Sequence, residues 1–502
     1  MNSLRHFALG EPFPASPHAV ISCLPTMADV CGYEEHDPRV MDVMKSGYPR
    51  FVVHEFVQQL IGFYADRESL AGRYARLVSG RRAANDMLEW LGEGFVKLEV
   101  DESVYLIHCD ASDEQRSHDV RKFVQHTGCG ISSRQAEDLL IQHGLREKRF
   151  AEESFAGNAL SEVEAKLAKQ IGCRQSDVLV CASGMNAFYA SFRAIQEFQQ
   201  SRKRTAWVQL GWLYLDSGKI LAQYLSEGES LECIYDVFDV DAVLARIHEL
   251  GDSLAAVVVE CPSNPLIQVC ELRRIATAVR EQGGAMLVDP TIASVYNTDV
   301  LASTDILTTS LTKYAAIEGD VMIGALAVNP DSPFYGDLVL RTSSFHVPPY
   351  ARDLARLAYE MELAPAIIEK MNANAAKLCA YLRQHKAVKK IYCAGCSEHF
   401  EEVSRQDVPA GAVISIELEG DIGKFYDSVR LMKGPSFGTC YTLLCPFMYL
   451  AHYDLVTSED GRAFLKSVGI DPELIRISVG GEPYEQIEAV FAEALDSNSG
   501  DC

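Results

Sequence analysis

Short apolar runs alternate with longer amphipathic segments between about residues 177 and 329. We predict seven β-strands in this region, at residues 178–181, 206–210, 231–235, 256–260, 285–289, 305–309 and 323–328. Several of these runs are almost entirely apolar, which is typical of strands that are covered on both faces. The pattern therefore predicts an α/β domain built on a mostly parallel sheet.

Two segments between these strands show helical periodicity. Their apolar positions are Met185, Phe188, Phe192 and Ile195 in the first segment, and Leu272, Ile275, Ala276 and Val279 in the second. Gly283 and Gly284 follow the second segment and are typical of a helix end. In such a domain the ligand is expected at the carboxyl ends of the strands.

The rest of the chain follows a different pattern. Residues 350–385 predict long helices interrupted at Pro365, followed by strands at 413–418 and 474–479 and a last helix at 486–495. These elements predict a second, smaller α+β domain. The first 150 residues are less regular, although 95–100 and 103–107 indicate a hairpin and 134–143 a short helix.

The charge balance excludes some classes of partner. The 502 residues include 46 basic and 70 acidic ones, for a formal net charge of −24. A surplus of negative charge argues against a primary nucleic-acid or anionic membrane surface. The apolar runs are too short to cross a bilayer, and the N-terminus lacks the pattern of a signal peptide. We therefore expect the 15 cysteines to be reduced thiols and the location to be cytoplasmic.

Two charged residues follow predicted buried strands. Asp289 ends one strand, and there it fits either a helix cap or salt bridge, or a partner for a protonated ring nitrogen of a cofactor. Lys313 follows another strand, and it fits either a surface lysine or a nucleophile that forms a Schiff base. Ser310 and Thr312 alternate with Lys313 and carry hydroxyls that could bind a phosphate.

Other strand ends carry weaker signals. Ser183-Gly184-Met185 precedes a predicted helix, so it fits either a simple N-cap or an anion site with a close glycine approach. Tyr214 follows a strand and fits either a core position or a ring that stacks on a flat cofactor. Residues 260–265, Glu-Cys-Pro-Ser-Asn-Pro, turn through two prolines at the end of another strand.

The order of these motifs resembles the cystathionine γ-synthase (Cys/Met metabolism) family of pyridoxal-phosphate enzymes. The core resemblance covers about residue 161 to the end of the chain, and it includes a final Arg-Ile-Ser-Val-Gly at 476–480. The N-terminal pieces at 18–20, 23–26, 32–35 and 47–51 are similar to the long, fungal-type cystathionine γ-synthases. The resemblance implies a fold-type I (aspartate aminotransferase-like) transferase with a mostly parallel seven-stranded sheet and a smaller C-terminal α+β domain.

The resemblance implies pyridoxal 5′-phosphate as cofactor and no metal. Lys313 matches the lysine that forms the Schiff base and moves protons, and Tyr214 matches a tyrosine that stacks on the ring and can act as an acid or base. The other residues matched to cofactor binding are Asp289 for the ring nitrogen, Asn264 near the ring hydroxyl, and Gly184, Met185, Ser310 and Thr312 for the phosphate. Arg476 matches the arginine that binds the substrate carboxylate, with Ser436 beside it.

The family also uses a Tyr-x-Arg motif that is lent to the neighbouring subunit's phosphate. Here Tyr48 and Arg50 have the right spacing, although Pro49 also fits the start of a helix. This assignment implies a homodimer or a homotetramer. It also implies four parts: an arm at 1–67, an insertion at 68–149, a cofactor domain at 150–349 and a small domain with its linking helix at 350–502.

The activity implied by the resemblance is γ-substitution on an activated homoserine ester. With cysteine as the thiol this reaction forms cystathionine, a step of transsulfuration and methionine biosynthesis. The alternatives are γ-elimination, sulfide addition to an O-acylhomoserine, and γ-substitution with an unusual nucleophile in secondary metabolism; a non-catalytic relative is the option from another class. The chain departs from the family at Pro290, at residues 316–318 and at Tyr441, where many relatives have a glutamate. These departures leave the exact amino-acid substrate open.

Three further patterns are set aside. Residues 128–133, Gly-Cys-Gly-Ile-Ser-Ser, lack the third glycine and the preceding strand of a dinucleotide loop. Five residues have no standard zinc spacing and are expected to be scattered: His108, Cys109, His118, His126 and Cys129. Cys393 and Cys396, with His399, lack a second cysteine pair, and we expect a loop there rather than a metal or redox site.

Overall fold

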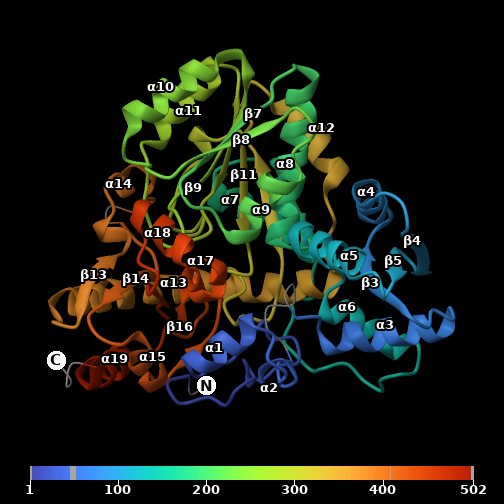
Figure 1. Cartoon of the computed structure of the whole chain (residues 1–502), viewed down its shortest axis with the longest axis horizontal. Coiled ribbons are helices and arrows are strands. Elements are labelled where there is room, and N and C mark those ends of the chain that lie inside the picture. The colour runs from blue at the N-terminus through green and yellow to red at the C-terminus, as the bar shows by residue number, and fades with distance from the viewer. Residues whose placement is uncertain (1–2, 46–51, 407–408, 499–502) are drawn as a thin grey trace.

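The computed structural model describes residues 3–45, 52–406 and 409–498. Its centre is a seven-stranded sheet with the order β6-β12-β11-β10-β9-β7-β8 (Figure 1). The strands are β6 (Val178–Cys181), β7 (Ala206–Leu210), β8 (Ser230–Ile234), β9 (Leu254–Glu260), β10 (Ala285–Asp289), β11 (Ile306–Ser310) and β12 (Gly324–Val328). Paired strands are parallel except at β12, which is antiparallel to both β11 and β6. The predicted sheet is confirmed, with strand ends displaced by at most two residues.

Helices cover both faces of this sheet. One face packs against α7 (Ala159–Ile171), α10 (Val240–Leu250) and α11 (Leu272–Glu281). The other face packs against α8 (Gly184–Ser201), α9 (Leu215–Gln223) and α12 (Tyr335–Phe345). Every residue of β9 is buried, as its apolar run requires. The predicted helices after Ser183 and at 272–279 are confirmed as α8 and α11.

A single long helix, α13 (Ala351–Gln384), follows the sheet. The predicted interruption at Pro365 is wrong, because the helix continues through this residue. Pro365 has no N–H and so leaves one carbonyl without its helical donor. Good helix formers surround it, and α13 packs along α7 and the C-terminal sheet, so tertiary contacts outweigh the lost bond.

The C-terminal part contains a five-stranded sheet with the order β13-β14-β17-β16-β15. Its strands are β13 (Val388–Tyr392), β14 (Val413–Leu418), β15 (Met432–Lys433), β16 (Leu443–Pro446) and β17 (Ile475–Ser478). The helices here are α14 (Phe400–Val403), α15 (Ile422–Ser428), α16 (Phe447–Ala451), α17 (Tyr453–Thr457), α18 (Glu459–Ser467) and α19 (Tyr484–Asn498). The predicted α+β character, the two strands and the last helix are confirmed.

A three-stranded antiparallel sheet, ordered β3-β5-β4, lies beside α5 (Glu114–Thr127), a helix that also contacts α8 (Figure 1). It consists of β3 (Arg73–Ser79), β4 (Val96–Asp101) and β5 (Val104–Asp110), and the predicted hairpin is β4–β5. The surrounding helices are α3 (Glu55–Arg67), α4 (Arg81–Leu91), α5 and α6 (Ser133–Gln142). The short helix at 134–143 is thereby confirmed as α6. The domain boundaries given above stay a prediction.

The N-terminal residues pack against the C-terminal sheet. They form β1 (Pro12–Phe13), β2 (Ile21–Ser22), α1 (Met27–Glu34) and α2 (Pro38–Met41). The Tyr426 hydroxyl donates to the carbonyl of Leu24 at 2.8 Å, and Lys433 Nζ donates to the carbonyl of Pro25 at 2.8 Å. Figure 1 shows α1 beside the helices of the C-terminal part.

The structure also tests the expectations about cysteines and membrane-spanning helices. The prediction that all cysteines are reduced is wrong at one pair, because Cys379 and Cys393 form a disulfide. Within residues 3–45, 52–406 and 409–498, no helix combines the length and the apolar content needed to cross a membrane.

Candidate active site

A cavity opens at the carboxyl ends of the central strands. It gathers most of the predicted site residues: Gly184, Met185, Tyr214, Asn264, Asp289, Ser310, Thr312, Lys313 and Arg476. Parallel strands end at the same edge of a sheet, so residues far apart in the sequence meet there. Ser436 lies behind this wall, whereas Tyr48 and Arg50 fall in 46–51, outside the described residues.

The start of α8 forms one end of the cavity. A Cβ atom on Gly184 would lie 2.7 Å from the Cβ of Ser310, so only glycine permits this close approach. Ser183 caps the helix, since its Oγ accepts from the backbone N–H of Asn186 at 3.0 Å. The other N–H groups of the first turn have no intrahelical acceptor, and together with the hydroxyls of Ser310 and Thr312 they suit a phosphate group.

Asp289 ends β10 and faces the same cavity. Its Oδ1 accepts from the backbone N–H of Thr291 at 2.8 Å. Burial raises the pKa of the Asp289 carboxyl to about 6, against the opposing effect of the Thr291 hydrogen bonds. A carboxylate held out of water gains most from a cationic or N–H partner, so this position suits a protonated ring nitrogen.

Lys313 follows β11 and is only 5% exposed, so the alternative of a surface lysine is wrong. Its Nζ lies 5.4 Å from the centroid of the Phe437 ring. The side chain therefore contributes an amine to a largely apolar part of the wall, where it can reach a ligand in the cavity.

Arg476 comes from β17 of the C-terminal sheet and is 4% exposed. Its guanidinium lies between the rings of Phe437 and Phe447, at 4.9 and 4.8 Å from their centroids. It donates to Oδ1 of Asn264 at 3.0 Å and to the carbonyl of Ser436 at 3.3 Å. No described carboxylate forms an ion pair with it. A buried guanidinium that faces a cavity without an acidic partner is suited to bind the carboxylate of a ligand.

Glu260 is a site residue to which the sequence analysis gave no role. It ends β9 in register with Asp289 on β10, and its Oε1 accepts from the backbone N–H of Tyr214 at 2.5 Å. Burial, and then the neighbouring Asp289 charge, raise the pKa of Glu260 well above its usual range. The sequence does carry a signal for this pair, because an acidic residue ends each of two consecutive predicted strands, and such strands are often neighbours in a parallel sheet.

Aromatic and aliphatic side chains complete the wall. Phe437, Phe447, Met322 and Leu450 line the cavity and make the region next to Lys313 and Arg476 apolar. They come from loops and short helices of several parts of the chain, so no sequence pattern linked them. Ser436 has a buried hydroxyl without a hydrogen-bond partner among the described residues.

The patterns that were set aside lie elsewhere. Gly128 ends α5 and Ser132 caps α6, so residues 128–133 join two helices and are not a dinucleotide loop after a strand. His108, Cys109, His118, His126 and Cys129 are not among the closely spaced groups of potential metal ligands found in the described chain. The expectation of a plain loop at Cys393 and Cys396 is wrong, because both contact other sulfur atoms.

The cavity fits the cofactor that the resemblance implies. A glycine-lined helix start suits its phosphate, a buried carboxyl suits its ring nitrogen, and a buried amine suits its aldehyde. These three groups line one continuous space, and the Arg476 guanidinium, which forms no ion pair with a described carboxylate, adds a place for an amino-acid carboxylate.

Comparison with known proteins agrees with this reading. Residues 106–496 match the family model described as Cys/Met metabolism PLP-dependent enzyme, where PLP is pyridoxal 5′-phosphate. An L-2-amino-4-chloropent-4-enoate dechlorinase/desaturase of Streptantibioticus cattleyicolor is 33% identical over 492 residues, covering 97% of this chain and 98% of that protein. The cystathionine γ-synthase of Neurospora crassa is 26% identical over 620 aligned residues, covering 97% and 98%.

Solved structures show the same fold. The cystathionine γ-synthase of Xanthomonas oryzae pv. oryzae, in complex with cystathionine, has a TM-score of 0.59 at 22% identity, and the match covers 71% of this chain and 90% of that one. A cystathionine γ-lyase of Lactobacillus plantarum complexed with L-serine has a TM-score of 0.56 at 22% identity, covering 71% and 92%. The expected fold-type I architecture is thereby confirmed.

Proposed function

The chain belongs to the Cys/Met metabolism PLP-dependent enzymes, and from this premise we propose that it breaks the bond between the γ carbon of an α-amino acid and a leaving group. Arg476 carries this proposal. Its buried guanidinium has hydrogen-bond acceptors but no described acidic partner, and it shares the cavity with Lys313. An amino acid held by its carboxylate at Arg476 has its α carbon directed towards the amine.

The residues that would hold the cofactor form three sets, one for its phosphate, one for its ring nitrogen and one for its ring. All these residues line the one cavity. Gly184, Met185, Ser310 and Thr312 would hold the cofactor's phosphate, Asp289 would pair with its ring nitrogen, and Tyr214 and Asn264 would lie beside its ring. When bound, the cofactor would supply an electron sink for bonds broken at the α carbon. Lys313 would supply the amine that holds the cofactor and would move protons at the substrate carbons, and Tyr214 would offer a second acid or base at the same wall.

The fate of the γ carbon distinguishes two candidate reactions. The first is elimination, in which the leaving group departs without replacement and an unsaturated amino acid forms. The apolar wall of Phe437, Phe447, Met322 and Leu450 supports it, because such a surface accommodates an uncharged γ substituent. The similarity of 33% to a dechlorinase/desaturase over nearly the whole chain supports it further. We therefore propose loss of a halide or similar leaving group as the main reaction.

The second candidate is the reaction expected from the sequence: capture of cysteine by an activated homoserine ester to form cystathionine. The similarity to the Neurospora crassa enzyme supports it. The second amino acid must also be held by its charged groups. Tyr441, which stands where many relatives have a glutamate, is buried and donates its hydroxyl to the carbonyl of Phe13 at 3.0 Å, and it does not line the cavity. This arrangement favours elimination over substitution.

Product analysis separates the two candidates. Purified enzyme with cofactor is given L-2-amino-4-chloropent-4-enoate, O-acetylhomoserine or O-succinylhomoserine, each with and without cysteine, and chloride and amino-acid products are measured. We expect chloride release that cysteine does not change, and no release by Lys313→Ala. Cystathionine as the main product would identify the second reaction instead, and absence of turnover with all three substrates would contradict the proposal.

We further propose a homo-oligomer, a dimer or a tetramer, in which Tyr48 and Arg50 reach the neighbouring subunit's phosphate. The support is the resemblance of residues 47–51 to the family motif. Mixing Lys313→Ala chains with Arg50→Ala chains tests the shared site, because each hybrid dimer carries one intact site. Hybrids that form without recovering activity would contradict it.

A further inference from the structure

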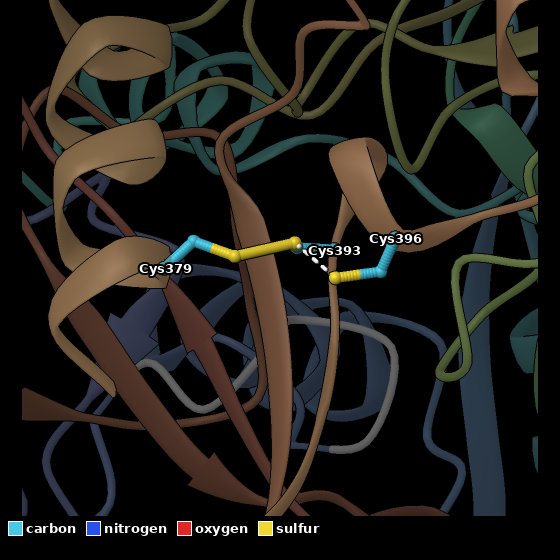
Figure 2. Close-up of side chains that lie close together, drawn as sticks. All are labelled: Cys379, Cys393 and Cys396. Carbon is cyan, nitrogen blue, oxygen red and sulfur yellow. Dashed lines mark hydrogen bonds between the residues drawn. A yellow bond between two sulfur atoms is a disulfide. The ribbon is translucent and has the colours of Figure 1, made fainter. Parts of the chain in front are cut away.

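Three sulfur atoms converge in the C-terminal part of the chain (Figure 2). Cys379 lies on α13, whereas Cys393 and Cys396 flank the short turn that follows β13. Their Sγ atoms all lie within 4.8 Å of one another, and those of Cys393 and Cys396 are 2.9 Å apart. Within the described residues, this is the only group of three or more potential metal ligands with such spacing.

The backbone spacing suits a bridge wider than a disulfide. The Cα atoms of Cys379 and Cys393 are 7.1 Å apart. Disulfides usually join Cα atoms that are about 4.4–6.8 Å apart. A zinc ion forms two bonds of about 2.3 Å to thiolates, which places the two sulfurs about 3.8 Å apart in a tetrahedral site. A metal therefore spans this distance with the backbone nearly where it is.

The two cysteines of the turn have the ligand spacing of structural zinc sites. Cys393 and Cys396 are separated by two residues, and both sulfurs point to the same side of the turn (Figure 2). Cys-x-x-Cys pairs supply two zinc ligands from one turn in many such sites. The third ligand, Cys379, comes from a different element 14 residues earlier, which is why the spacing pattern alone did not reveal it.

The surroundings suit a cluster of thiolates. Arg383, one helical turn after Cys379, donates from Nη2 to the Sγ of Cys396 at 2.8 Å. A guanidinium in this position offsets part of the negative charge of three thiolates and orients one of them. Cys396 is exposed, so water can occupy a fourth coordination position. His399 is not one of the residues whose ligand atoms lie within 4.8 Å of one another, so it is not included among the ligands.

We propose that the reduced chain binds a thiophilic divalent cation such as Zn²⁺ through Cys379, Cys393 and Cys396, with water as the fourth ligand. The site ties α13 to the turn after β13, and the disulfide is its oxidised, metal-free form. A dithiol reductant supplies the two electrons and two protons that convert the disulfide to two thiols, and it becomes a cyclic disulfide itself. Metal binding then releases the three thiol protons. None of these steps depends on the proposed reaction at Lys313.

Zinc retention by the full chain, loaded with cofactor, tests the proposal. The protein is reduced with a dithiol, freed of reductant without air, mixed with Zn²⁺ and desalted, and bound zinc is measured by mass spectrometry. We expect one zinc per chain, and a rise in the melting temperature on zinc addition. A chain that retains no zinc after the three thiols have been shown to be free would overturn the proposal.

Matched variants assign the ligands. Cys396→Ser leaves a polar residue at an exposed position, so it is expected to fold and to lose about tenfold or more in zinc affinity. Cys233→Ser, the other exposed free cysteine of the described chain, is expected to bind zinc as the parent does. Replacing zinc with Co²⁺ is expected to give thiolate-to-cobalt absorption in the parent and Cys233→Ser, and weaker absorption in Cys396→Ser. Equal zinc binding by Cys396→Ser and the parent would overturn the assignment.

Discussion

Asp289 and Glu260 stand in register at the ends of neighbouring parallel strands, and the pKa of each of these buried carboxyl groups is raised. The pKa of Asp289 is raised to about 6, while burial and the Asp289 charge raise the pKa of Glu260 well above its usual range. Near neutral pH, Asp289 is therefore largely ionised, whereas the Glu260 carboxyl holds its proton more strongly than an ordinary glutamate does. The site thus places a carboxylate that can pair with the ring nitrogen beside a second carboxyl group of raised pKa.

The different pKa values of this pair predict unequal effects of two similar substitutions. Glu260→Gln replaces a carboxyl group of raised pKa by a neutral amide of the same shape, so we expect kcat/KM within about fivefold of the parent. Asp289→Asn removes the charge that stabilises a protonated ring nitrogen, and we expect a loss of about 10²-fold or more. Steady-state kinetics on the substrate found in the product analysis measures both. Equal losses would show that Glu260 is also ionised.

The raised pKa of Asp289 also predicts how pH affects stability. The folded chain without cofactor binds this proton more tightly than the unfolded chain, so the contribution of Asp289 to the free energy of unfolding falls as pH rises from 3.8 to about 6 and stays lower above. Pairing with the protonated ring nitrogen removes that cost. We therefore expect the cofactor to raise the melting temperature more at about pH 8 than at about pH 5.

The control for this pH dependence is Asp289→Asn, which cannot ionise at this position. Its melting temperature should respond to the cofactor almost equally at the two pH values. A parent protein whose stabilisation by the cofactor decreases towards high pH would contradict the assignment of Asp289. Differential scanning calorimetry measures the melting temperature of the parent and of Asp289→Asn at both pH values, each with and without cofactor.

Arg476→Lys tests the carboxylate site. Lysine keeps the positive charge but loses the planar fork and the stacking between Phe437 and Phe447. We expect a loss of about 2–5 kcal/mol in transition-state stabilisation, which is about 30-fold or more in kcat/KM, appearing largely in KM. Absorbance of the bound cofactor should be unchanged in this variant. An unchanged KM would place the substrate carboxylate elsewhere.

Gly184→Ala tests the close approach at the start of α8. The added Cβ would lie 2.7 Å from the Cβ of Ser310. Either the start of α8 or the end of β11 must therefore shift away from the phosphate position. We expect cofactor affinity to fall at least about tenfold, measured by equilibrium dialysis. Gly336→Ala on α12 is the matched control, because nothing lies within 4 Å of its added Cβ and affinity should not change.

Much of the central fold could be predicted because its physical signals are local. Apart from the edge strand β8, the strands of the central sheet are mostly buried, so their apolar runs show in the sequence, and Asp289 and Lys313 stand out as charges at strand ends. The continuity of α13 through Pro365 could not be predicted, since it depends on packing against α7 and the C-terminal sheet.

The less predictable part of the site comes from long-range contacts. Phe437 and Phe447 enclose Arg476 although the first lies in a loop and the second begins the short helix α16, so no periodicity connects them. Cys379 likewise meets Cys393 and Cys396 from a separate helix. The pairing of Glu260 with Asp289 depends on strand order, which the sequence does not state directly.

The packing of the first residues against the C-terminal sheet has a consequence for biosynthesis. Leu24 and Pro25 accept hydrogen bonds from Tyr426 and Lys433, which lie about 400 positions later. Contacts between residues so far apart in the sequence form late in folding. The chain loses conformational entropy when the long loop between them closes, and only afterwards does the contact stabilise the fold. Residues 24 and 25 therefore leave the ribosome about 400 positions before their partners and must wait for that stretch to emerge before they reach their place, and chaperones can bind them during that long interval.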